Sequence, residues 1–232
     1  MYNLLIYSAR STRSGSRPID VRAGSFGPHG YNPGILGPSA LPTVPSPVSC
    51  KDRTMTQSTF SYNDRPLLLV VDGHAMVYRA FFSIPERLST STGQDTRGAY
   101  GFLTTFLKVV RDHNPTHAAV AFDTSAPTFR DDRYPEYKAG RPPMPPELRQ
   151  QFPLVKRILD SFKIPYYEKD GWEADDLIGT MSRLATEADM NTLVVTGDRD
   201  ELQLVSDTVN VLMYSGYGNT KVYGINEFRE RY

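Results

Sequence analysis

Residues 173–180 read Glu173-Ala174-Asp175-Asp176-Leu177-Ile178-Gly179-Thr180, and they place three carboxylates directly before an amphipathic run. Leu177, Met181 and Leu184 recur at helical spacing, which predicts that the acids occupy the first turn of a helix. A helix start favours negative charge because its free N–H groups and its dipole attract anions. Three acids are more than a cap needs, so two interpretations stay open: an ordinary helix start or a functional cluster.

Acidic residues also follow short apolar runs elsewhere in the chain. Each run has the length and composition of a buried parallel strand, and residues 74–82, 98–112 and 152–162 between them have helical periodicity. This alternation predicts an α/β domain with a largely parallel central sheet flanked by helices. The runs and their acids are 66–71 with Asp72, 117–122 with Asp123, and 191–196 with Asp198 and Asp200.

The strand-ending acids and the acidic helix start are expected at one edge of the sheet, because ligands of open parallel sheets bind beyond the carboxyl ends of the strands. Like charges gathered there need compensation, and no matching set of Lys or Arg accompanies them. Oxygen ligands favour Mg²⁺ or Mn²⁺ over zinc, and a pair of such ions suits phosphodiester hydrolysis. The candidate metal ligands are Asp72, Asp123, Glu173, Asp175, Asp176, Asp198 and Asp200.

Residues 124–151 interleave aromatic side chains with cations, and several prolines interrupt them. Such a basic arch segment suits a mobile loop that meets a phosphate backbone and stacked bases. Because acids dilute the charge, a solvated and salt-bridged surface is the alternative. The candidate DNA-binding residues are Arg130, Tyr134, Tyr137, Lys138 and Arg141.

Composition narrows the classes of function. The 232 residues have a formal net charge of zero, so any attraction to nucleic acid must be local. A single cysteine, Cys50, and four His exclude a disulfide framework and give no zinc ligand set. A reducing, cytoplasmic compartment fits this cysteine usage, and no apolar run is long enough to cross a membrane.

Residues 1–61 differ from the rest because Gly, Pro and Ser dominate and no helical or strand period persists. Disorder is expected there. The Arg-rich, acid-poor start is compatible with an organelle transit peptide, but we favour an uninformative leader. Translation begins at Met1 or at Met55.

Several motifs, in order from Arg65 to Tyr232, resemble the 5′ nuclease domain of bacterial DNA polymerase I. Together they are specific, whereas a lone Asp-Gly pair would mean nothing. The matching segments are 71–73, 78–82, 115–123, 128–130, 137–145, 173–180 and 196–204.

The resemblance implies a PIN-like 5′ nuclease fold and a 5′-3′ exonuclease or flap endonuclease that acts in DNA replication and repair. Its expected substrates are DNA with a 5′ flap, nicked or branched duplex and RNA primers, bound by a monomer with two Mg²⁺ or Mn²⁺ ions. The seven acids above match the metal ligands of the family. Arg79, Lys138 and Arg141 match its catalytic, phosphate-contacting cations, and Tyr137 matches the aromatic residue beside them.

The family continues with two more Asp ligands and a helical hairpin that grips duplex DNA, whereas this chain stops before both. Residues 62–232 are therefore expected to be the N-terminal catalytic part. The alternative is a branched-DNA-binding fragment with weak or no catalysis. A toprim-type site would leave Asp72 and Asp123 without a role, and a haloacid-dehalogenase-type phosphatase would need Asp where His74 stands.

Overall fold

Six strands form one sheet in the computed structural model, which describes residues 62, 64–84, 88–134, 136, 142–214 and 220–231. The strand order is β3-β2-β1-β4-β5-β6, and every neighbouring pair is parallel except β5 and β6. The predicted α/β fold with a largely parallel sheet is confirmed. The strands are β1 (Leu67–Asp72), β2 (His117–Ala121), β3 (Tyr166–Tyr167), β4 (Asn191–Thr196), β5 (Val209–Tyr214) and β6 (Thr220–Tyr223).

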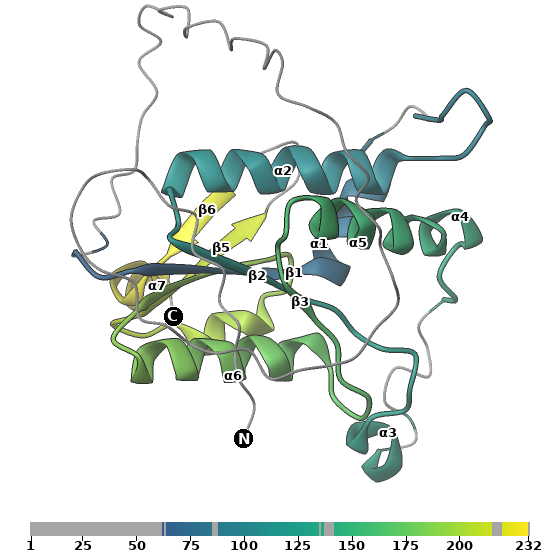
Figure 1. Cartoon of the computed structure of the whole chain (residues 1–232). Helices are drawn as coiled ribbons and strands as arrows, with labels where there is room; N and C mark the ends of the chain where they lie inside the picture. Colours follow the sequence, from purple (N-terminus) through teal and green to yellow (C-terminus); the bar gives the residue numbers. More distant parts are fainter. Residues whose placement is uncertain are drawn as a thin grey trace, which may run out of the picture. The chain divides into compact units, whose positions relative to one another are not determined.

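Helices cover both faces of the sheet (Figure 1). They are α1 (Gly73–Ser83), α2 (Arg97–His113), α3 (Phe129–Arg133), α4 (Pro146–Arg149), α5 (Gln151–Ser161), α6 (Ala174–Glu187), the 3₁₀ helix η1 (Asp200–Leu204) and α7 (Ile225–Arg231). Helices α1, α2 and α5 lie over one face, and α6 lies under the other. None of the helices in the described part of the chain has the length and hydropathy needed to cross a membrane.

The sequence of β1 explains this layering. Leu67, Leu69 and Val71 belong to the core shared with α1, α2 and α5, whereas Leu68 and Val70 belong to the core shared with α6. Successive side chains of a strand point to opposite faces, so a strand covered on both sides reads as one continuous apolar run. All six residues of β1 are buried, as this pattern requires.

The point where the strand order reverses lies beside β1. The chain leaves β1 towards β2 on one side and returns through α6 to β4 on the other side. In open parallel sheets, ligands bind at such switch points, beyond the carboxyl ends of the strands. Asp72, the last residue of β1, therefore marks the place for a site.

Some elements were not predicted. Helices α3 and α4 lie within the segment that was expected to be a loop, and β6 adds an antiparallel edge. A capping box between Thr128 and Asp131 begins α3, and Pro146 occupies the first position of α4, where its missing N–H is harmless. The predicted disorder of residues 1–61 falls wholly outside the described residues, as do Tyr137, Lys138 and Arg141.

Candidate functional site

A cavity of about 910 Å³ opens at the carboxyl edge of the sheet. It receives side chains from the ends of β1, β2 and β4 and from the start of α6, and Arg79 of α1 also lines it. The structure therefore brings six of the seven candidate acids to one place, and Asp176 is the one that does not line this cavity. The six are Asp72, Asp123, Glu173, Asp175, Asp198 and Asp200.

Asp72 is the most deeply placed of the strand-ending acids, with 4% of its surface exposed. Its carboxylate caps α1 by accepting from the Ala75 N–H at 2.9 Å, and it accepts from Thr196 Oγ1 at 3.0 Å. Burial raises the pKa of Asp72 to about 7; these two hydrogen bonds oppose the shift, and the charges of Asp175 and Asp123 add to it. A cation beside Asp72 would relieve the same penalty.

Asp123 ties the end of β2 to the start of α6. Its Oδ1 accepts from the Ala174 N–H, the first of that helix, at 2.7 Å. Its own N–H donates to Nδ1 of His74 at 3.1 Å, and the His74 ring stacks on Phe152 with centroids 4.3 Å apart. His74 is therefore a packed residue that holds the backbone of Asp123 in place.

Glu201 is an acid that the sequence analysis missed. It follows Asp200 directly, and an acid in such a charged run is normally solvated, but the η1 turn leaves only 1% of Glu201 exposed. Burial, followed by the charge of Asp175, raises the pKa of Glu201 to about 9. Burial also raises the pKa of Asp175. The sequence contains no signal for this burial, because it follows only from the way η1 turns the side chain inward.

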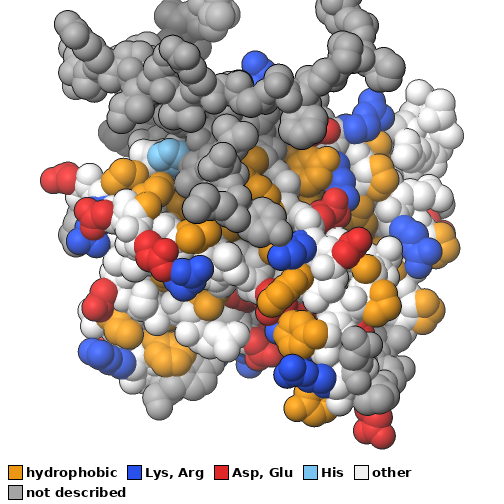
Figure 2. All heavy atoms as spheres, turned by 60° about the horizontal axis from the view of Figure 1, so that its bottom comes forward, with side chains coloured by type: hydrophobic (Ala, Val, Ile, Leu, Met, Phe, Trp, Pro, Cys, Tyr) orange, Lys and Arg blue, Asp and Glu red, His pale blue; other side chains and the backbone are white. Residues whose placement is uncertain are grey.

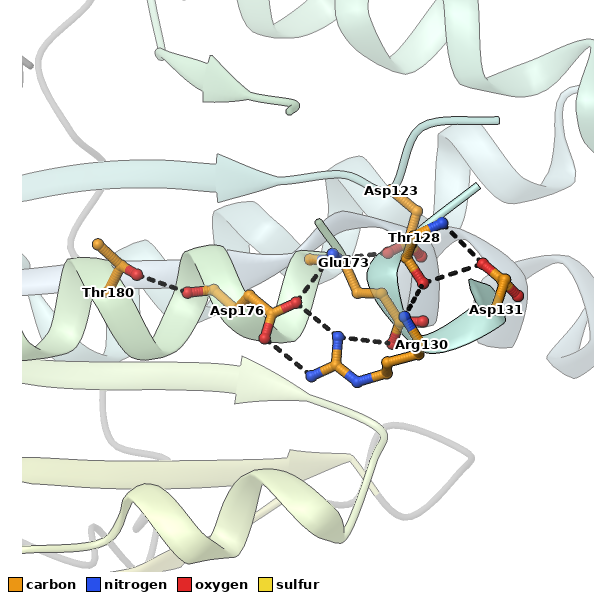
Figure 3. A network of polar contacts seen from close by, with 8 residues as sticks. Asp123, Thr128, Arg130, Asp131, Glu173, Asp176 and Thr180 are labelled. Atoms are coloured by element: carbon orange, nitrogen blue, oxygen red, sulfur yellow. Dashed lines mark hydrogen bonds and ion pairs between the residues drawn. The ribbon is translucent and has the colours of Figure 1, made fainter. Parts of the chain in front are cut away.

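Asp176 is not among the residues that line the cavity, and it binds Arg130 of α3 (Figure 3). The two guanidinium nitrogens of Arg130 lie 2.7 and 2.8 Å from the two carboxylate oxygens. Asp176 also accepts from the Glu173 N–H at 3.0 Å, so it serves as a helix cap. Both interpretations of the acidic stretch find support: Glu173 and Asp176 form the capping box of α6, and Glu173 and Asp175 line the cavity. Ligation by Asp176 stays a prediction.

We expect Arg130→Ala to lower the free energy of unfolding by about 1–2 kcal/mol, because it leaves a partly buried carboxylate unpaired. The side chains of Arg130 and Asp176 are 28% and 18% exposed, so solvent screening keeps the loss below that of a fully buried pair. Urea titration measures the change, with the exposed Arg149→Ala as the matched control. Adding Asp176→Asn should cost less in the Arg130→Ala background than in the wild type; equal costs would show that the pair does not stabilise the fold.

Arg79 is the candidate cation that the structure places at the cavity. Its Nη1 is buried and has no hydrogen-bond partner among the described residues. It lies near the loop after β4, since a Cβ built on Gly197 would be 3.5 Å from it. An unpaired guanidinium nitrogen beside a cavity is suited to an anionic group of a ligand. Tyr134 is 67% exposed at the end of α3.

The chemistry of the lining fits a divalent cation. Within the described residues, no three His, Cys, Asp or Glu side chains stand close enough together to hold a metal ion as they are. Burial and the neighbouring acids nevertheless raise the pKa values of Asp72, Asp175 and Glu201, so these carboxyls hold protons that a bound cation could replace. An all-oxygen set of this kind suits Mg²⁺ or Mn²⁺.

The face of the described part of the chain that Figure 2 shows has no extended basic surface that could attract DNA. Lys and Arg side chains are scattered there among acidic and apolar ones and do not form one basic patch. This agrees with the formal net charge of zero. Attraction to a polyanion would therefore depend on particular cations near the cavity.

In metal-free buffer, we expect stability to fall as the pH rises. The pKa of Asp72 rises from 3.8 in the unfolded chain to about 7 in the fold, and the pKa of Glu201 rises from 4.5 to about 9. Between these pH values the folded protein holds protons on both carboxyls that the unfolded chain has lost. The stabilisation by these protonated carboxyls is complete below about pH 4 and is lost towards pH 9. Urea midpoints with EDTA at pH 5.5 and pH 8 test this; a Glu201→Gln midpoint that falls as steeply as the wild type would contradict it.

Comparison with known sequences gives one family. A model of the "5′-3′ exonuclease, N-terminal resolvase-like domain" matches residues 67–232. DNA polymerase I of Chloroflexus aurantiacus is 46% identical over 171 residues, which cover 72% of this chain and 18% of that protein. DNA polymerase I of Bacillus subtilis is 39% identical over 170 residues, which cover 73% and 19%. The chain thus spans about a fifth of the length of these relatives.

Solved structures show the same fold. The D15 protein of bacteriophage T5, crystallised with metal ions, matches with a TM-score of 0.55 at 20% identity, covering 71% of this chain and 60% of that one. The T5 5′-exonuclease with zinc bound gives 0.53 at 20% identity over the same shares. The predicted 5′ nuclease fold is confirmed by these matches.

Proposed function

This chain belongs to the family of 5′-3′ exonuclease N-terminal resolvase-like domains, and from that premise we propose that it hydrolyses phosphodiester bonds at the 5′ ends of DNA strands. The observation that carries the proposal is the cavity at the switch point, which six carboxylates and Arg79 line together. Neither a solvated surface nor a helix cap needs that gathering of acids. It suits a nuclease that works with divalent cations.

The residues that would hold the cations are the six cavity acids, with Mg²⁺ or Mn²⁺ as the ions. The chemistry that a pair of such ions supplies when bound is activation of the attacking water and stabilisation of the leaving oxygen. Asp72 and Asp123 are fixed by backbone hydrogen bonds before any ion arrives, so their oxygens are oriented in advance. Pre-oriented ligands lower the cost of binding.

In this proposal, basic side chains bind the phosphates of the substrate. Arg79 has an unpaired nitrogen at the cavity and would donate to the scissile phosphate. Lys138 and Arg141 would contact phosphates on the arch, and Tyr137 and Tyr134 would stack on unpaired bases. Arg130 is held by Asp176, so we assign it the task of fixing α3 beside the acids in addition to its predicted DNA contact.

The proposed substrates are 5′ flaps and nicked or branched duplex DNA, together with RNA primers. We propose residues 62–232 as the nuclease part of a DNA polymerase I, acting as a monomer in the cytoplasm where its DNA lies, with residues 1–61 as a leader that takes no part in cleavage. The T5 flap endonuclease was crystallised with DNA and metal ions and has this fold at a TM-score of 0.52 and 19% identity. That likeness supports the choice of a branched DNA substrate.

Cleavage of a labelled 5′ flap tests the proposal. The full chain and a chain that begins at Met55 are each incubated at saturating concentration with Mg²⁺, Mn²⁺, Ca²⁺ or EDTA. We expect both chains to release the flap with Mg²⁺ or Mn²⁺ and not with EDTA. Binding of the flap in Ca²⁺ without cleavage in any metal would favour the alternative, a branched-DNA-binding module. Loss of cleavage on removal of the leader would overturn the domain assignment.

A further inference from the structure

One buried carboxyl beside the cavity has no role so far. Glu201 is 1% exposed, and its two carboxylate oxygens meet no hydrogen-bond donor among the described residues other than the carboxyl of Asp175, with which they can share a proton. A buried carboxyl without a hydrogen-bond donor is normally destabilising, and more so when it is charged. A side chain of this kind therefore calls for a partner that binds from outside the protein.

The residues around Glu201 indicate that this partner is a cation. The groups that act on its carboxyl electrostatically are Asp175, Asp72 and Asp198, all of them acids. No Lys or Arg is among them. Three acids around a fourth cannot compensate one another, whereas a divalent cation would compensate all four.

We propose that Glu201 is a further carboxylate of the metal centre, which adds to the charge that binds a divalent, oxygen-preferring cation and orients Asp175 towards it. Two independent observations carry this: the full burial of a carboxyl that has no cationic partner among the described residues, and its position next to three acids of the cavity, one of which, Asp175, it contacts. The inference rests on the proposed metal-dependent function. Residues of this kind, adjacent to the ligands, typically change metal affinity by 10–100-fold when they are replaced.

The test measures Mn²⁺ affinity by calorimetry, with the rise in melting temperature on adding Mn²⁺ as a second readout. Glu201→Gln keeps the shape of the side chain but cannot ionise when the cation binds, and we expect it to weaken Mn²⁺ binding by roughly 10-fold. Glu230→Gln, on the exposed surface of α7, removes the same charge elsewhere and should leave the affinity unchanged. The melting temperature in EDTA establishes that each variant is folded.

Glu201→Met provides a second variant, because an apolar side chain of similar length removes the buried unpaired oxygens and should fold at least as well as the wild type. We expect it also to bind Mn²⁺ roughly 10-fold less tightly. If the wild type and both variants bind Mn²⁺ within twofold of one another, Glu201 is a protonated core residue and the inference is wrong. If the wild type binds no Mn²⁺, the proposed function itself fails, and this outcome is distinct from the first.

Discussion

Asp72→Asn is expected to abolish metal-dependent flap cleavage and to leave the fold as stable as in the wild type or more so. The amide oxygen of Asn can still accept from the Ala75 N–H, and its NH₂ group can donate to Thr196 Oγ1, so the cap and the link to β4 survive. The penalty of burying a carboxylate disappears, because an amide does not ionise. The proposed metal centre, in contrast, loses the most buried of its strand-ending carboxylates.

We expect the cleavage rate to drop by roughly 10³-fold or more, since metal ions supply several kcal/mol of transition-state stabilisation. The measurement is single-turnover cleavage at saturating enzyme and Mg²⁺, together with the melting temperature in EDTA. Asp160→Asn, an exposed acid on α5, is the matched control and should cleave at the wild-type rate. Cleavage by Asp72→Asn within tenfold of the wild type would exclude Asp72 from the site.

The sequence was sufficient where the position of a residue in the fold follows from local pattern. An apolar run of strand length followed by an acid places that acid at the carboxyl edge of a parallel sheet, and Asp72, Asp123 and Asp198 all line the cavity there. The capped, amphipathic start of α6 likewise brought Glu173 and Asp175 to the same edge. These predictions needed only the period of the side chains and the direction of the strands.

The features of the site that could not be predicted from the sequence depend on contacts between residues far apart in the chain. Asp176 and Arg130 are 46 positions apart, and only the fold shows that one cap acid is bound by a cation from α3. The sequence around Glu201 is typical of a solvated acidic run, whereas in the structure the 3₁₀ helix η1 places Glu201 in the interior. In both cases the residue type was plain in the sequence, and its partner or burial was not.

Phe122 links the core to the site, and we expect Phe122→Ala to lower the free energy of unfolding by roughly 3–5 kcal/mol. The side chain is fully buried, and its ring contacts those of Phe152 and Tyr166 with centroids 6.2 and 6.0 Å apart. It also precedes Asp123 directly, so the cavity left by the ring should let this carboxylate move. We therefore expect the melting-temperature rise with Mn²⁺ to shrink as well.

Gly73 shows how tightly the Phe122 ring is held, because a Cβ built on Gly73 would lie only 2.3 Å from its Cε1 atom. Gly73→Ala alone should therefore cost roughly 1–3 kcal/mol, although Ala favours a helix more than Gly. Phe122→Leu removes part of the obstructing ring, so the double variant should be more stable than the sum of the single losses by roughly 1 kcal/mol. Urea titrations of the four proteins measure this coupling. Strict additivity would mean that the ring moves aside freely, and Phe122 would then not be what holds Asp123 in place.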